Sequence, residues 1–156
     1  MSATNAFAIV PIAAESASLL RTRLVDDDGN ALTPRHDDAR HQCRSCLSLT
    51  TPGEGFLLVS HRPFPTRQPY AERGPVFVHE RNCVPYADPS VYPPEFPHHA
   101  VVLRAYDERD EIAGAELVGE REPEDVIRRL FDDPRVAYLH ARNSTYGCYM
   151  FRVDRG

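Results

Sequence analysis

The stretch VAYLHAR-NSTYG-CYMFRV, Val136–Val153, decides the fold, because two segments of strand-like composition flank a polar turn that contains a glycine. Val136–Arg142 and Cys148–Val153 are predicted as paired antiparallel strands, closed by Asn143–Gly147. The residues just before them, Glu122–Asp133, have the pattern of a helix, with a proline near the start, acidic residues in the first turn and an apolar face. A helix followed by a hairpin is therefore expected at the carboxyl end.

Alternation along the first of these strands separates two faces, because neighbouring side chains of a strand point in opposite directions. Leu139 and Ala141 are expected to pack against the helix. Tyr138, His140 and Arg142 share the other face, which is predicted to lie outside the core.

The remainder of the chain adds further strands to this pattern. They are predicted at Phe7–Ile12, Phe56–Ser60, Pro75–His79, Val101–Tyr106 and Ile112–Val118. A short helix is predicted over Glu15–Val25. Proline-rich stretches such as Asn82–Pro97 cannot form central strands or helices and are predicted as long loops. The expected class is α+β: a mainly antiparallel sheet with one firm helix near the C-terminus and long Pro-rich loops.

Length and charge limit the classes of function. A chain of 156 residues suits a single domain spanning residues 1–156. The net charge of −5 disfavours nucleic acid and anionic membrane as partners. The amino-terminal stretch lacks a basic segment, so we expect a cytoplasmic protein whose four cysteines form no disulfides.

Chemistry-bearing residues gather at the Val136–Val153 hairpin. His140 and Cys148 are candidate catalytic groups, as acid or base and as nucleophile. Arg142 is a candidate for binding a carboxylate or phosphate. Further candidate ligand-binding residues are Asn143, Tyr146, Arg44 and His79. The preferred function is the binding or processing of a small anionic molecule, while enzymatic activity and oligomeric state stay open.

The turn register decides which face carries Cys148, since a shift of one residue exchanges the two faces. A three-residue loop, Thr145–Gly147, pairs Ser144 with Cys148 and places the thiol beside Arg142. A four-residue loop, Asn143–Tyr146, instead pairs Ala141 with Cys148. We favour the first register because its last loop position suits the glycine.

Cys43, Cys46, His79 and Cys83 have the spacing of paired zinc ligands, Cys-x2-Cys and His-x3-Cys. The alternation from Arg44 to Leu49, however, predicts a strand, in which residues three apart face opposite sides. Cys43 and Cys46 are then not expected to converge. We therefore predict no cofactor, with zinc as the alternative. The rival function is a structural zinc-binding or protein-interaction module without catalysis.

Four segments together resemble one bacterial family. They are CRSCL (Cys43–Leu47), PGEGFLLVSHRPF (Pro52–Phe64), PYAERGPVFVHERNC (Pro69–Cys83) and HARNSTYGCYMFRV (His140–Val153). Their order and spacing are similar to those of the family called Domain of Unknown Function 1203. The resemblance implies a small soluble bacterial domain and no particular activity.

Overall fold

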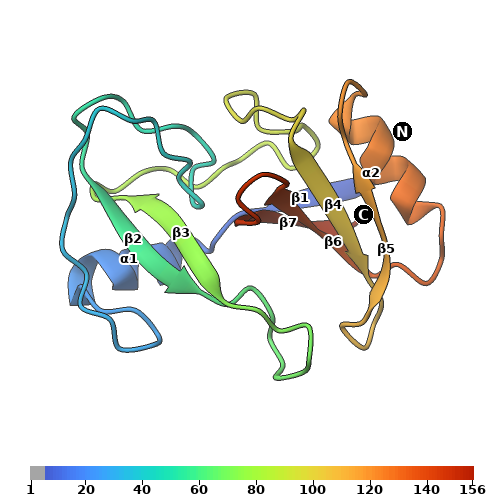
Figure 1. The fold of residues 1–156 in the computed structure, drawn as a ribbon, viewed down its shortest axis with the longest axis horizontal. Helices are drawn as coiled ribbons and strands as arrows, with labels where there is room; N and C mark the ends of the chain where they lie inside the picture. Colours follow the sequence, from blue (N-terminus) through green and yellow to red (C-terminus); the bar gives the residue numbers. More distant parts are fainter. Residues whose placement is uncertain (1–5) are drawn as a thin grey trace.

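The structure, a computed structural model, describes residues 6–156 and contains two antiparallel sheets (Figure 1). The larger sheet has five strands in the order β1-β7-β6-β4-β5, and the smaller consists of β2 and β3. The strands are β1 Phe7–Val10, β2 Phe56–His61, β3 Gly74–His79, β4 Val101–Tyr106, β5 Ile112–Leu117, β6 Tyr138–Asn143 and β7 Tyr149–Arg155. The predicted α+β class with a mainly antiparallel sheet is confirmed.

Two helices accompany the sheets: α1, Ala14–Arg23, and α2, Pro123–Phe131. Pro123 occupies the start of α2, where its missing N–H costs no hydrogen bond. The apolar side of α2, including Val126 and Ile127, packs in one core with Leu139 and Phe151 of the larger sheet. This face of the sheet is thus covered, as the alternation in β6 predicts.

The smaller sheet builds a second core with α1. Leu57 and Val59 from β2 pack with Val76 and Val78 from β3 and with Ala17 of α1. Figure 1 shows α1 and the β2–β3 hairpin on one side of the molecule, and the larger sheet with α2 on the other. Residues 24–55 connect α1 to β2 without a helix or a named strand, and isolated backbone bridges from Arg35 to Phe56 and from Cys43 to Phe77 attach them to the smaller sheet.

The second face of β6 is buried, contrary to the sequence prediction. Tyr138, His140 and Arg142 are all below one tenth exposed. Phe64, from the segment joining β2 to β3, packs edge-on against Tyr106 and against the ring of His140. Alternation in β6 could not reveal this cover, because it comes from an irregular segment distant in sequence.

The β6–β7 hairpin follows neither of the two predicted registers. Asn143 accepts the Gly147 N–H and donates its own N–H to the Cys148 carbonyl, so the loop comprises residues 144–147. A register shift beside Arg142 then pairs this residue with Tyr149. Gly147 has φ of 79°, a left-handed conformation that favours glycine, and it is the last residue of the loop, as in the favoured register.

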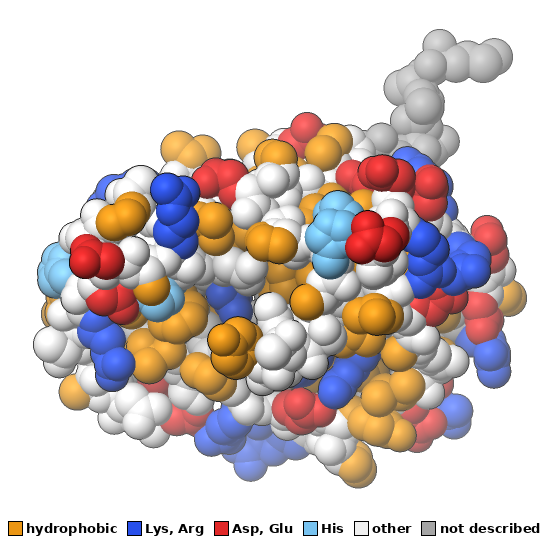
Figure 2. Space-filling model, turned by 45° about the horizontal axis from the view of Figure 1, so that its top comes forward, with side chains coloured by type: hydrophobic (Ala, Val, Ile, Leu, Met, Phe, Trp, Pro, Cys, Tyr) orange, Lys and Arg blue, Asp and Glu red, His pale blue; other side chains and the backbone are white. Residues whose placement is uncertain are grey.

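Among residues 6–156 no helix has the length and apolar character needed to cross a membrane. On the face drawn in Figure 2, acidic and basic side chains are interspersed with hydrophobic ones. This face therefore presents no single broad patch of one charge.

Candidate metal centre

Residues Cys43–Cys46 form a tight turn, which we call the knuckle. The Cys43 carbonyl accepts the N–H of Leu47 at 3.0 Å, and the Cys43 N–H donates to the Ser48 carbonyl at 2.9 Å. The turn is attached to the smaller sheet, since the Arg44 N–H donates to the Phe77 carbonyl of β3. It brings Cys43 and Cys46 to the same side, so the strand predicted over this segment is wrong.

Leu47 makes this turn possible by adopting a φ of 54°, in the left-handed region. That conformation costs a non-glycine residue roughly 1–2 kcal/mol. The side chain of Leu47 is buried in the larger core, and burying a leucine contributes about 1.5–3 kcal/mol. Packing therefore offsets the strain. Because a leucine and not a glycine takes the left-handed position, the sequence carries no recognisable turn signal here.

The other two ligands come from β3 and the residues after it. His79 is the last residue of β3 and is fully buried, and Cys83 follows four residues later. The backbone N–H of His79 donates to the Cys43 Sγ at 3.4 Å, a contact that places the end of β3 directly against the knuckle. The sheet thus fixes one pair of ligands relative to the other.

The four side chains converge on one point. The Sγ atoms of Cys43, Cys46 and Cys83 and a ring nitrogen of His79 all lie within 4.8 Å of one another. The Cys43 and Cys83 Sγ atoms are 3.9 Å apart, and Cys46 Sγ lies 3.4 Å from His79 Nδ1. A tetrahedral zinc ion with usual bond lengths separates two sulfurs by roughly 3.8 Å and a sulfur from a nitrogen by roughly 3.6 Å. The arrangement fits the zinc alternative.

Neighbouring groups are suited to a metal-bound thiolate cluster. The Arg21 guanidinium, from α1, donates through Nη2 to Cys83 Sγ at 3.1 Å and through Nε to the His79 carbonyl at 2.9 Å. Three thiolates, a neutral imidazole and Zn²⁺ would carry a charge of about −1, which one arginine balances. Arg21 therefore both orients two ligands and compensates their charge.

Glu54 completes the surroundings on the far side of the imidazole. Its Oε2 lies 3.4 Å from His79 Nε2, while Nδ1 faces the sulfurs. Metal-binding histidines commonly direct their second nitrogen to a carboxylate, which orients the ring. The Thr51 N–H and then the Arg81 guanidinium lower the pKa of Glu54 to about 2, so it is an anion at neutral pH.

The thiols perturb one another strongly because they are so close. Hydrogen bonds from the Cys46 and Cys83 thiols lower the pKa of the Cys43 thiol well below its usual range. The same proximity raises the pKa of Cys46. All four cysteines are free thiols in the structure.

The residues predicted for an anion pocket are only partly brought together. Arg44, Asn143, Tyr146 and Cys148 line one cavity of about 440 Å³. Arg142 lines a neighbouring cavity of about 200 Å³ that Tyr146 and Cys148 also border. Its Nη1 lies 3.4 Å from Glu72 and donates to the Gly147 carbonyl, so a carboxylate of the chain already meets its charge.

His140 and His79 lie apart from these two cavities. His140 is fully buried among aromatic rings, and neither ring nitrogen has a hydrogen-bond partner among the described residues. It lines neither cavity that Cys148 lines. His79 belongs to the metal cluster.

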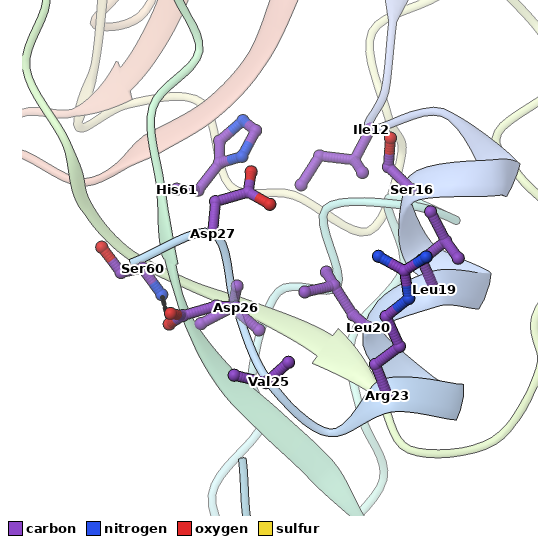
Figure 3. Close-up of a pocket in the computed structure, with 11 residues that line it drawn as sticks. Ile12, Ser16, Leu19, Leu20, Arg23, Val25, Asp26, Asp27, Ser60 and His61 are labelled. Atoms are coloured by element: carbon purple, nitrogen blue, oxygen red, sulfur yellow. Dashed lines mark hydrogen bonds between the residues drawn. The ribbon is translucent and has the colours of Figure 1, made fainter. Parts of the chain in front are cut away.

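A third cavity, of about 190 Å³, lies between α1 and β2 (Figure 3). Its walls include Ile12, Leu19 and Leu20, and Figure 3 shows Asp26 turned toward Ser60, whose N–H it accepts at 3.0 Å. None of the candidate site residues predicted from the sequence lines this cavity.

Arg21 and Glu54, which contact the metal cluster, were not predicted from the sequence. The chain has many charged residues, and nothing in the local pattern distinguishes these two.

The structure thus defines an α+β protein in which three cysteines and one histidine converge on one point. The chain belongs to the family described as "Protein of unknown function (DUF1203)", whose model matches residues 40–155 and so includes all four cluster residues. This confirms the resemblance seen in the sequence. No curated protein and no solved structure is significantly similar to the chain.

Proposed function

We propose that this protein binds one zinc ion through Cys43, Cys46, His79 and Cys83, and that the ion holds the β2–β3 half of the fold together. The observation that carries the proposal is the convergence of three sulfurs and one imidazole nitrogen within 4.8 Å. Thiolate and imidazole ligands in a tetrahedral set favour zinc over magnesium or calcium, which prefer oxygen ligands.

A structural role follows from the number and position of the ligands. Four protein ligands complete a tetrahedral shell and leave no position for substrate. The ligands come from the knuckle, the end of β3 and the segment after it, and Arg21 adds α1 to the group. The ion would therefore connect three segments that lie up to 40 residues apart in the sequence.

The binding of a small anion is a second candidate function, and the observation that favours it is the buried guanidinium of Arg44 beside a cavity. Nothing in the surroundings of His140 supports a catalytic step with Cys148. The second candidate function is therefore the binding of a small anion without catalysis.

Metal analysis tests the first proposal. Protein purified under reducing conditions and passed through gel filtration with a weak chelator should retain one zinc ion per chain, measured by mass spectrometry against protein concentration. Replacement by Co²⁺ should give the intense visible bands of tetrahedral cobalt with thiolate ligands. Substoichiometric metal of mixed identity, together with no such bands, would contradict the proposal.

A further inference from the structure

The cavity of about 440 Å³ opens directly beside the knuckle. Its lining includes Arg40, Arg44, Phe77, Asn143, Tyr146 and Cys148. The residues come from the knuckle, from β3 and from the β6–β7 loop, so the cavity lies where the two halves of the fold meet. Its volume is within the range of pockets that hold small molecules.

Arg44 gives this cavity an unbalanced positive charge. The residue is 3% exposed, and no carboxylate lies within ion-pair distance of its guanidinium in residues 6–156. An arginine guanidinium is a cation at neutral pH. A buried charge without a counter-ion is costly, and an anionic ligand would remove that cost.

The hydrogen bonds of Arg44 leave one nitrogen available. Nε donates to the Tyr149 carbonyl at 2.8 Å and Nη1 to the Gln42 carbonyl at 2.5 Å. Nη2 has no hydrogen-bond partner within the described part of the chain and keeps contact with solvent. The Asn143 side chain uses its Oδ1 for the N–H groups of Thr145 and Tyr146, which leaves its amide nitrogen as a second donor.

The remaining wall of the cavity suits a flat apolar group. Phe77 and Pro75 form one side, and Tyr146, which is 82% exposed, stands at the rim. Among the described residues that line the cavity there is no aspartate or glutamate, although the chain as a whole is acidic. A small inorganic anion would leave the apolar wall unused.

We propose that this cavity binds a small aromatic carboxylate, with its carboxylate on Arg44 and its ring between Phe77 and Tyr146. The proposal rests on the proposed metal site, because Arg44 is one of the two residues between Cys43 and Cys46. The turn that presents its guanidinium is the turn that the ion would fix. Ligand binding should therefore be weaker in protein from which zinc has been removed.

Benzoate is the probe for this test, and calorimetry on zinc-loaded protein is the measurement. We expect saturable binding, and slower alkylation of Cys148 by iodoacetamide when benzoate is present, since this thiol lines the cavity. Benzyl alcohol, which has the ring without the charge, and inorganic phosphate, which has charge without the ring, should each bind at least 10-fold more weakly. Equal binding of either compound would overturn the proposed ligand class.

Two variants keep the test independent of folding. Arg44→Gln should weaken benzoate binding at least 10-fold, the usual loss for a charged hydrogen bond. If this buried substitution prevents folding, Tyr146→Ala changes an exposed residue and should weaken binding about 3-fold or more while leaving the melting temperature unchanged. Benzoate affinity that is unchanged in every variant that folds would overturn the inference.

Zinc content measured on the same samples separates the two proposals. A zinc-loaded protein that ignores benzoate overturns the cavity assignment alone. A protein without zinc that binds benzoate through Arg44 overturns the metal proposal and the dependence on it, and supports the cavity itself.

Discussion

Cys83→Ser is expected to abolish tight zinc binding and to lower the melting temperature by roughly 10 °C. Zinc that binds only the folded state stabilises that state by its binding free energy. Losing one of four ligands should remove about 3–5 kcal/mol of this stabilisation, and for a chain of this size 1 kcal/mol corresponds to about 2–4 °C. Thermal unfolding of both proteins, with zinc measured on each sample, tests the expectation.

Cys148→Ser is the matched control, because it makes the same chemical change outside the cluster. It should leave both zinc content and the melting temperature close to those of the unmodified protein. The metal account fails if the two serine variants have the same stability and the same zinc content.

Acid should destabilise the fold through His140. Burial, and then the nearby positive charges of Arg142 and Arg152, lower the pKa of His140 from 6.5 to about 3. The unfolded chain binds this proton at higher pH than the folded one does. Stability is therefore greatest above pH 6.5 and decreases as the pH falls from 6.5 toward 3. Each pH unit in this window corresponds to about 1.4 kcal/mol, so about 2 kcal/mol is lost by pH 5.

His140→Leu isolates this contribution, since the substituted side chain has no proton to bind. Urea unfolding at pH 7 and pH 5 should show a pH-dependent loss smaller by about 2 kcal/mol in the variant than in the unmodified protein. His99→Leu, which changes an exposed histidine, should leave the loss unchanged. An equal loss in His140→Leu and in the unmodified protein would show that His140 does not carry the effect.

Much of the sheet could be predicted from the sequence, because each strand has a local pattern. Phe56–Ser60 and Pro75–His79 are short apolar segments next to turn residues, and both are strands in the structure. The face of β6 that meets α2 was also predictable, since small and apolar residues alternate there. The burial of Tyr138 and His140 was not, because Phe64 reaches that face from an irregular segment far away in the sequence.

The four metal ligands were visible as two spaced pairs, but their convergence was not. Arg44–Leu49 alternates as a strand does, and the left-handed Leu47 that turns the chain is indistinguishable in sequence from an ordinary core leucine. The Cys148 hairpin differs for another reason: its loop comprises residues 144–147, so Asn143 pairs with Cys148 in a register that neither predicted loop gives. At the knuckle, tertiary packing outweighs the local pattern.

The central claim is that Cys43, Cys46, His79 and Cys83 hold one zinc ion. X-ray absorption at the zinc edge of the purified protein tests it most directly, because it counts the ligand atoms by type. The account predicts three sulfur ligands at about 2.3 Å and one nitrogen ligand at about 2.0–2.1 Å. A shell made of oxygen and nitrogen without sulfur would show that any bound zinc lies elsewhere, and would contradict the account.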